Sequence, residues 1–405
     1  MISPVLNYRG VIEEISGEIA FQYISRAKEL ASKGFSVISF GVGQPDIPTP
    51  PHIIEEGKKA LDLRYTGYTE TEGIKELRES VAEYLNTRYG SDVRPDEVLI
   101  TMGTKGAAYL AMAAYVRPND EVIVTDPTYP VYSELPKFFG ARPVYVPLKW
   151  LGSEEGFALD LNAIHESITK KTRGIAIVNP HNPTGAVFSR REIEGLMDLA
   201  RDYKLLIFAD EIYDNFLYED ADFKSFMSFP DWRDYILYCN GFSKTFSMTG
   251  WRLGYLVARR EVAKLLIKLA VNTWSCPPSI AQKAGITALK GDWTPVKEMV
   301  RLFNKRRLTL YNELKKVKGF EVWRGKGAFY LFPRVAKLLD SIGLDVEAFV
   351  NKLIDEKYVV TLPGTAFPRD FGKNYIRFSY AVDEEKIIEG VRRIKELVEE
   401  ITAKT

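Results

Sequence analysis

The stretch that decides the fold is NGFSKTFSMTGWRLG, residues 240–254, in which one lysine stands between small and apolar residues. It begins at the end of an apolar run, Ile236 to Asn240, that predicts a buried strand. Partial burial lowers the pKa of a lysine and makes its neutral amine available as a nucleophile, so Lys244 is a candidate catalytic residue. Arg252 has no acidic residue near it in the sequence. Its guanidinium therefore favours an anion brought from elsewhere, and a phosphate suits its geometry.

Around this stretch, short β-branched and apolar runs alternate with longer helical patterns such as Gly106 to Val116 and Arg191 to Tyr203. The alternation predicts an α/β fold with a mostly parallel sheet and helices on both faces. In such sheets, ligands gather where the strands end. Besides Ile236 to Asn240, the runs that predict buried strands are Val98 to Thr101, Glu121 to Thr125, Ile175 to Asn179 and Leu205 to Ala209.

The last third of the chain predicts a second, smaller α/β unit. Trp293 to Val317 has the pattern of one long helix, and three later runs, Val322 to Phe332, Val359 to Pro363 and Tyr375 to Ala381, are typical of strands. We expect an N-terminal arm and the first part of the small domain at 1–49. A large domain follows at 50–289, and a linking helix with the small C-terminal domain at 290–405.

Composition excludes several classes of function. The 405 residues are 46% hydrophobic and 27% charged, which is typical of a globular protein. Lys and Arg (55) balance Asp and Glu (54), so no field attracts nucleic acid or a membrane surface. Two cysteines and three histidines predict neither a disulfide framework nor a metal site. Without a signal-like N-terminus or an apolar span, the expected location is the cytoplasm.

Further polar residues follow the predicted strands. Asp210 ends the apolar run 205–209, and a buried carboxylate there needs a cationic or hydrogen-bonding partner. The segment 179–185, NPHNPTG, predicts a tight turn whose Asn182–Pro183 bond is a candidate for cis. Residues 101–106, TMGTKG, lie between a strand and a helix, where free N–H groups and the helix dipole favour a phosphate.

The segment 375–379, YIRFS, alternates with a period of two, which places Arg377 on one face with Tyr375 and Ser379. An arginine inside an apolar strand predicts a bidentate carboxylate partner. Gly41 and Gly43 could suggest a dinucleotide fingerprint. However, Asp46 stands where the third glycine belongs and prolines follow in place of a helix, so we reject that reading.

Together, these motifs resemble the class I/II, fold-type I, pyridoxal-phosphate-dependent aminotransferases, and most closely the archaeal and bacterial aspartate or aromatic branch. The likeness runs from about Gly17 to the last helix, with the motifs in the expected order. Residues 240–254 resemble the Schiff-base lysine signature of that family. The resemblance implies that Lys244 binds the cofactor, pyridoxal 5'-phosphate, and moves the substrate proton.

The resemblance also implies the other roles. Asp210 holds the pyridine nitrogen protonated, which makes the ring an electron sink. Tyr213 and Asn182 donate to the phenolic oxygen, and Asn182 also helps Arg377 to orient the substrate. Tyr129 stacks on the ring, and Gly43 lets the substrate carboxylate, held by Arg377, approach the backbone. The phosphate is bound by Gly103, Thr104, Lys105 and Arg252. Tyr68 reaches the phosphate of the neighbouring subunit, which implies a homodimer. His181 and Glu211 are expected to be structural.

The implied activity is transamination between an amino acid and a 2-oxo acid. The best expectation is aspartate, with 2-oxoglutarate as acceptor. A dicarboxylate requires a second cationic group, for which Arg9, Arg64 and Lys105 are candidates. An aromatic or broad-specificity aminotransferase remains the alternative, followed by a C–S lyase or decarboxylase on the same scaffold. A regulator that keeps the cofactor without turnover would carry an added DNA-binding domain, and fewer than twenty residues precede the likeness here.

Overall fold

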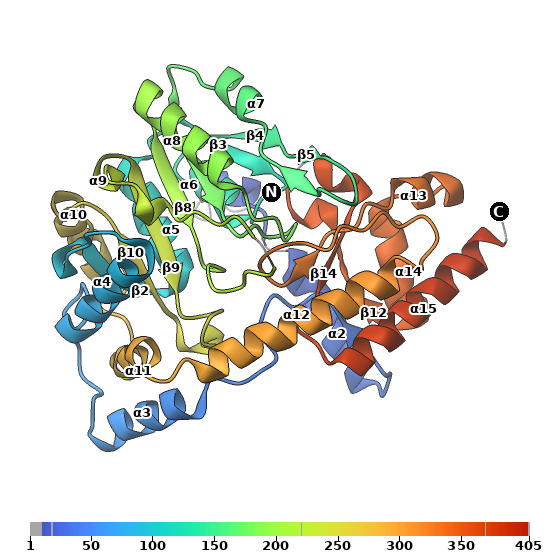
Figure 1. The fold of residues 1–405 in the computed structure, drawn as a ribbon, viewed down its shortest axis with the longest axis horizontal. Helices are drawn as coiled ribbons and strands as arrows, with labels where there is room; N and C mark the ends of the chain where they lie inside the picture. Colours follow the sequence, from blue (N-terminus) through green and yellow to red (C-terminus); the bar gives the residue numbers. More distant parts are fainter. Residues whose placement is uncertain (1–9, 18, 220, 369, 404–405) are drawn as a thin grey trace, which may run out of the picture.

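A seven-stranded sheet forms the centre of the protein in a computed structural model that describes residues 10–403 except 18, 220 and 369 (Figure 1). Its strand order is β2-β10-β9-β8-β7-β3-β4. The neighbours β9, β8, β7, β3 and β4 pair in parallel, whereas β10 is antiparallel to both β2 and β9. The expected mostly parallel sheet is therefore confirmed. Its strands are β2 (Val98–Met102), β3 (Glu121–Asp126), β4 (Arg142–Pro147), β7 (Thr172–Val178), β8 (Leu206–Asp210), β9 (Ile236–Gly241) and β10 (Leu253–Val257).

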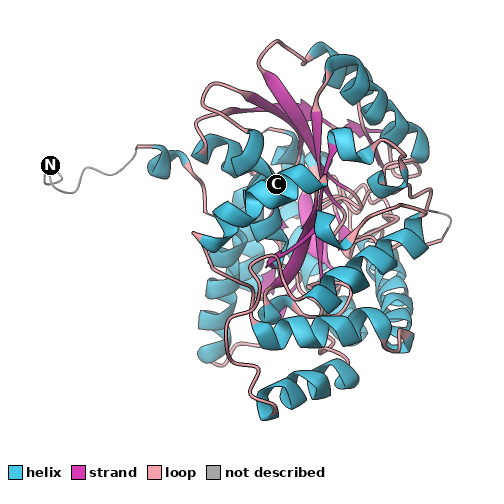
Figure 2. Ribbon diagram, turned by 90° about the vertical axis from the view of Figure 1, so that its left-hand side faces the viewer, coloured by secondary structure: helices cyan, strands magenta, loops and turns pink. Residues whose placement is uncertain are grey.

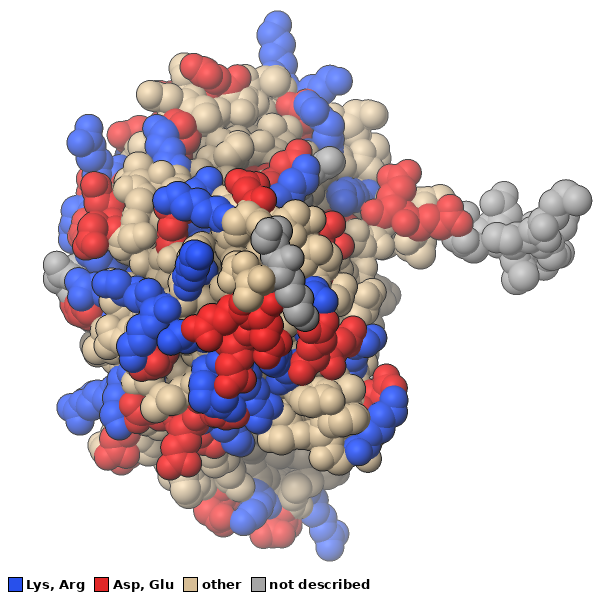
Figure 3. Space-filling model, turned by 90° about the vertical axis from the view of Figure 1, so that its right-hand side faces the viewer, with Lys and Arg blue, Asp and Glu red and all other residues tan. Residues whose placement is uncertain are grey.

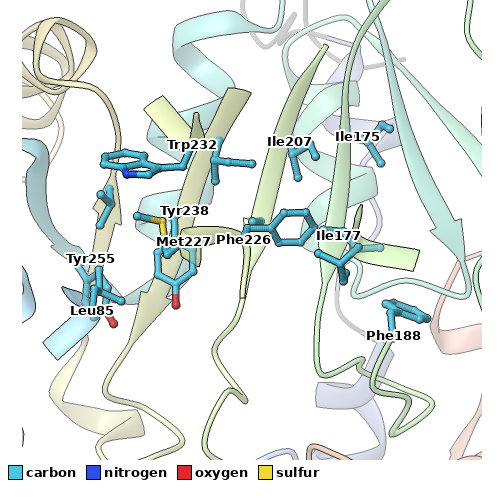
Figure 4. Packing of buried hydrophobic residues seen from close by; sticks show 14 of the residues in the cluster. Leu85, Ile175, Ile177, Phe188, Ile207, Phe226, Met227, Trp232, Tyr238 and Tyr255 are labelled. Carbon is cyan, nitrogen blue, oxygen red and sulfur yellow. The ribbon is translucent and has the colours of Figure 1, made fainter. Parts of the chain in front are cut away.

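Helices cover both faces of this sheet because successive strand residues point to opposite sides. In β7, Ile175 and Ile177 pack with α4 (Lys75–Tyr89), α8 (Arg190–Tyr203) and α11 (Ser279–Lys290). Ala176 and Val178 pack on the other face with α5 (Gly103–Tyr115) and α10 (Arg260–Val271). Figure 2 shows the sheet nearly edge-on between its helices, and Figure 4 shows part of the first cluster, where Phe226 lies between Ile207 and Ile177.

The strand directions bring five strand ends to one edge of the sheet. The parallel strands β3, β7, β8 and β9 end there. Because β10 is antiparallel to both of its neighbours, β2 runs in the same direction as β9 and ends at the same edge. Each of the five strands is followed by one of the segments that the sequence predicts to carry polar site residues.

A second unit lies beside the sheet, beyond the long helix α12 (Thr294–Leu314) (Figure 1). The N-terminal segment joins this unit because β1 (Ile38–Ser39) pairs in parallel with β12 (Val359–Val360). The proposed domain limits at 49/50 and 289/290 stay a prediction. The other elements of the unit are α2 (Ile19–Ser32), α13 (Ala336–Ile342), α14 (Val346–Lys357), α15 (Glu384–Thr402) and an antiparallel sheet of β11 (Tyr330–Leu331), β14 (Ile376–Ser379) and β13 (Leu362–Pro363).

One strand prediction is wrong. Of residues 322–332, only Tyr330–Leu331 forms a strand. Gly325 (φ +62°) and Ala328 (φ +53°) have left-handed backbone conformations, which a strand cannot contain. The sequence also gave no expectation for β4 or β10. The shorter elements are α1 (Val11–Glu14), α3 (Pro51–Asp62), α6 (Val131–Phe138), α7 (Leu161–Glu166), α9 (Trp232–Tyr235), β5 (Lys149–Trp150) and β6 (Phe157–Ala158).

The surface carries mixed charge. On the face shown in Figure 3, Lys and Arg lie among Asp and Glu without a large patch of one sign. Within residues 10–403, apart from the three undescribed positions, no helix is long and apolar enough to cross a membrane. The same residues contain no group of three or more His, Cys, Asp or Glu side chains that could hold a metal ion.

Candidate active site

A cavity of about 760 Å³ lies where the strand ends meet the second unit. Its wall contains every residue that the sequence predicts for the site except Gly103 and Tyr68. It also contains Tyr132, Tyr330 and Phe367, which the sequence analysis did not identify. The cavity thus brings together polar groups from segments that are far apart in the chain.

Lys244 stands in the loop that follows β9. Its Nζ donates a hydrogen bond of 2.6 Å to the carbonyl oxygen of Gly43 and lies about 6 Å from the ring centres of Tyr213 (6.0 Å) and Phe329 (5.9 Å). The side chain is half-buried. The amine therefore faces a partly apolar wall, and the Gly43 carbonyl fixes its direction.

Asp210 ends β8 and is 3% exposed. Tyr132, from α6, donates to Oδ2 at 2.7 Å, and the Ile212 N–H donates to Oδ1 at 3.0 Å. Burial raises the pKa of the Asp210 carboxyl to about 6, against the opposing effect of these two hydrogen bonds and of Lys244. A buried carboxylate in a cavity wall that titrates near neutral pH is suited to a cationic ring nitrogen.

The start of α5 forms an anion seat. Gly103 has a φ of +71°, and a Cβ there would lie 2.5 Å from Nη2 of Arg252. The hydroxyl of Thr104 is buried and makes no hydrogen bond within the described part of the chain. Arg252 donates to the carbonyls of Thr249 (3.0 Å) and Met102 (3.2 Å) but forms no ion pair with a described carboxylate. N–H groups at a helix start, a free hydroxyl and an unneutralised arginine together fit a phosphate.

Arg377, from β14, is 4% exposed and forms no ion pair among the residues that the structure describes. Nη1 donates to Oδ1 of Asn182 at 3.0 Å and Nη2 to the carbonyl of Gly41 at 2.8 Å, whereas the buried Nε has no partner. The guanidinium lies 4.4 Å from the ring centre of Tyr330 and 4.8 Å from that of Phe367. A buried guanidinium that lacks a counter-ion is a binding site for a carboxylate.

Tyr330, from β11, lies next to Tyr213, Gly43 and Arg377. Its hydroxyl lies 2.8 Å from that of Tyr213 and 2.7 Å from the position that a Cβ on Gly43 would take. Any side chain at position 43 would therefore collide with it. Sequence reasoning missed Tyr330 because its partner Tyr213 lies 117 positions away and no local pattern marks the contact.

Tyr129 and Lys105 share another part of the wall, where the Lys105 Nζ lies 5.7 Å from the Tyr129 ring centre. Tyr68 lies outside the cavity wall, between α3 and α4, with 90% of its surface exposed. His181 and Glu211 are fully buried and do not line the cavity. Glu211 instead accepts hydrogen bonds from Ser225 Oγ (2.6 Å) and the Phe226 N–H (2.8 Å).

Comparison with known proteins covers nearly the whole chain. The family model for aminotransferase class I and II matches residues 36–394. The chain is 48% identical over 397 residues to an aspartate aminotransferase of Sulfurisphaera tokodaii, with 98% of each protein covered. It is 36% identical to aromatic-amino-acid aminotransferase 2 of Thermococcus litoralis, with 93% of this chain and 95% of that protein covered. The solved structure of an aspartate aminotransferase from Thermotoga maritima superposes with a TM-score of 0.89 at 35% identity, over 97% of this chain and all of that one (100%).

Proposed function

The chain belongs to the class I and II aminotransferases, and from this premise we propose that its cavity binds pyridoxal 5'-phosphate, with Lys244 as the covalent attachment. The observation that carries the proposal is the convergence of the Lys244 amine, the buried Asp210 carboxylate and the anion site of Thr104 and Arg252 on one cavity. Each group matches one part of that cofactor: the amine matches the aldehyde, the carboxylate matches the ring nitrogen, and the hydrogen-bond donors match the phosphate.

In this assignment, Gly103, Thr104, Lys105 and Arg252 hold the phosphate and Tyr129 packs on the ring. Tyr213 and Asn182 donate to the phenolic oxygen. When bound, the cofactor supplies an aldehyde that condenses with amino groups and a protonated ring that accepts electron density. The protein contributes the orientation of the substrate, the exclusion of water and the transfer of a proton.

Substrate orientation falls to Arg377 and Asn182. The guanidinium is buried, held by Asn182 and the Gly41 carbonyl, and stacked on aromatic rings, so it is rigid before substrate arrives. It takes the α-carboxylate in bidentate fashion. The absence of a side chain at Gly43 leaves the backbone open to the same carboxylate. Lys244, directed by the Gly43 carbonyl, removes the proton from the substrate Cα and returns one to the Cα of the product amino acid.

For the substrate, we propose aspartate as amino donor and 2-oxoglutarate as acceptor, so that glutamate is the amino acid formed. The cationic residues of the cavity wall are Lys28, Lys105, Lys244, Arg252 and Arg377, against Asp46 and Asp210. Asp46 is already paired with Arg306 at 2.7 Å. Because Lys105 and Arg252 are assigned to the phosphate, Lys244 to the cofactor aldehyde and Arg377 to the α-carboxylate, Lys28 is the cation of this wall that is left to favour a second carboxylate on the substrate. Of the candidates for the second carboxylate, Lys105 lines the cavity, Arg64 does not, and Arg9 lies outside the described residues.

An aromatic or broad specificity is the second candidate. It is favoured by the apolar wall that Ile19, Phe21 and Ile24 of α2 and Phe367 add to the cavity. The test is the single-turnover rate of cofactor conversion with a panel of amino acids. The dicarboxylate proposal expects aspartate and glutamate to react at least about tenfold faster than tyrosine and phenylalanine. Release of ammonia or sulfide in place of a 2-oxo acid would indicate a lyase.

We also propose that the functional unit is a homodimer in which Tyr68 serves the phosphate of the neighbour. Tyr68 is 90% exposed and belongs to an exposed apolar segment with Leu61, Leu63 and Tyr65. Apolar surface of this kind is typical of a subunit interface. The mass of the protein in solution, compared with 46.0 kDa for one chain, tests the assembly.

A further inference from the structure

His181 stands in the middle of the turn that carries Asn182, yet its imidazole is buried behind the cavity wall. Its two ring nitrogens each contact a threonine hydroxyl. Nε2 lies 3.2 Å from Oγ1 of Thr125, near the end of β3, and Nδ1 lies 2.8 Å from Oγ1 of Thr184, in the same turn. The ring therefore bridges two segments that are 56 positions apart.

The directions of these hydrogen bonds follow from the neighbouring groups. Thr125 donates its single hydroxyl hydrogen to the carbonyl of Pro127 at 2.7 Å, and a carbonyl can only accept. The His181 Nε2 must then carry the hydrogen and donate to Thr125. A neutral imidazole has one N–H, so Nδ1 accepts from Thr184, whose oxygen in turn accepts from the Ala186 N–H at 3.2 Å.

The surroundings keep this imidazole neutral. The ring is fully buried, and burial lowers the pKa of His181 to about 3. Its polar neighbours are the hydroxyls of Thr125 and Thr184 and the carbonyl of Pro127, which opposes the effect of burial on the pKa without outweighing it, and none of these three groups carries a charge. A neutral histidine of this kind cannot act as a pH switch near neutrality, but it can fix the relative positions of the two segments that it links through Thr125 and Thr184.

We propose that His181, as the neutral Nε2–H tautomer, is a positioning residue that ties the turn of Asn182 to the turn of Tyr129. The chain of hydrogen bonds runs from the Ala186 N–H through Thr184, His181 and Thr125 to the Pro127 carbonyl. Asn182 follows His181 directly, and Tyr129 lies two residues after Pro127. The part of the inference that concerns the cofactor rests on the proposed function, whereas the tautomer and the bridge do not.

The tautomer can be observed directly because the chain has only three histidines, His52, His165 and His181. In protein labelled with ¹⁵N-histidine, long-range ¹H–¹⁵N correlation distinguishes the Nε2–H, Nδ1–H and charged forms, and His181→Asn identifies the signals of His181. We expect the neutral Nε2–H pattern at pH 7 and again at pH 5. An Nδ1–H or doubly protonated ring would overturn the proposal, whether or not the protein binds a cofactor.

The bridge is tested by a matched pair, Thr125→Val and Thr125→Ser. Valine keeps the shape but deletes the hydroxyl that joins His181 to Pro127, whereas serine retains it. Provided that the wild-type protein binds pyridoxal phosphate, Thr125→Val should weaken the affinity for the cofactor about tenfold, as expected for the loss of one buried hydrogen bond. It should also change the visible circular dichroism of the bound cofactor. Thr125→Ser should stay within about twofold of wild type.

Thr361→Val serves as the control for the substitution itself. Thr361 is fully buried, and its hydroxyl makes no hydrogen bond among the described residues. This variant should bind the cofactor with wild-type affinity and dichroism. If Thr125→Val lowers only the melting temperature and leaves both cofactor readouts unchanged, His181 is a packing residue and the proposal is wrong. If wild type binds no pyridoxal phosphate, the proposed function fails, and the tautomer measurement still decides the assignment of His181.

Discussion

Tyr132 donates a 2.7 Å hydrogen bond to Asp210 in the wall of the cavity, and both side chains are almost completely removed from solvent. The phenol stabilises the ionised carboxylate, but burial outweighs it and leaves the pKa of Asp210 near 6. Before a cationic partner binds, the protein therefore holds a carboxylate whose ionisation is unfavourable in the folded state.

This relationship predicts how the stability of the apoprotein depends on pH. Because the folded pKa is raised from the usual 3.8 to about 6, Asp210 contributes stability when it is protonated and loses it as pH rises through 6. Asp210→Asn removes the ionisation and keeps the shape, since the amide can accept from Ile212 and donate to Tyr132. We expect the variant to be more stable than wild type by about 1–3 kcal/mol at pH 8, and nearly equal to it at pH 4.

Thermal unfolding of both apoproteins at the two pH values measures the difference. The opposite order at pH 8, with Asp210→Asn less stable, would show that Asp210 gains more from its partners than it loses by burial. When saturated with cofactor, the same variant should turn over orders of magnitude more slowly, because an amide cannot keep the ring nitrogen protonated. Unchanged turnover would refute the assigned role of Asp210.

Lys244→Ala should abolish turnover and the covalent attachment of the cofactor, because the other lysines of the cavity wall, Lys28 and Lys105, are assigned no part in the chemistry. Borohydride reduction followed by peptide mapping measures the attachment in wild type, which we expect at Lys244 alone. Lys244→Arg is the control that retains the charge beside Gly43 but not the nucleophile, and it should be equally inactive. Stable labelling of a different lysine would refute the assignment.

Arg377→Leu should weaken substrate capture and spare cofactor binding, because the guanidinium contacts Asn182 and the Gly41 carbonyl and takes no part in the phosphate seat at α5. The loss of a buried bidentate partner for the α-carboxylate corresponds to about 2–5 kcal/mol in kcat/KM. Titration of the apoprotein with cofactor provides the control. A variant that loses the cofactor yet binds amino acids normally after reloading would place Arg377 at the phosphate.

Several of the residues that sequence reasoning placed in the cavity carry a local signal, whereas Gly43, Tyr129 and Tyr213 were assigned through the family resemblance. Asp210 and Lys244 each follow an apolar strand, and parallel strands bring their carboxyl ends to one edge, so a linear pattern was sufficient to predict the meeting point. Arg377 was recognisable because a charge inside an apolar strand needs a partner. The order of the strands in the central sheet was not needed to assign these residues to the site.

Tyr132 and Tyr330 were missed for a physical reason. Each completes a contact across the fold, Tyr132 with Asp210 over 78 positions and Tyr330 with Tyr213 over 117. Nothing in the surrounding sequence distinguishes such a tyrosine from a core aromatic. The strand predicted over 322–332 is mostly absent because the left-handed residues Gly325 and Ala328 turn the chain, and this turn contacts Gly185 and Pro180, which are far away in the sequence.

Tyr68 and Gly103 are the two predicted site residues that do not line the cavity, and the 90% exposure of Tyr68 agrees with a role in a neighbouring subunit. If each site takes Lys244 from one chain and Tyr68 from the other, then two defective homodimers can repair each other. In a hybrid of Lys244→Ala and Tyr68→Ala chains, one site inherits both defects and the other inherits none.

Mixing the two variants under conditions that exchange subunits should therefore restore about one normal site for each hybrid dimer. Chains with distinguishable tags allow the hybrids to be isolated, so that exchange is established independently of activity. Tyr68→Phe, which deletes only the hydroxyl, provides the matched variant: it should be as impaired in phosphate binding as Tyr68→Ala if the hydroxyl is the contact. Should tagged hybrids form while their activity stays at the average of the two parents, Tyr68 acts within its own subunit or only on its surface, and the shared site is wrong.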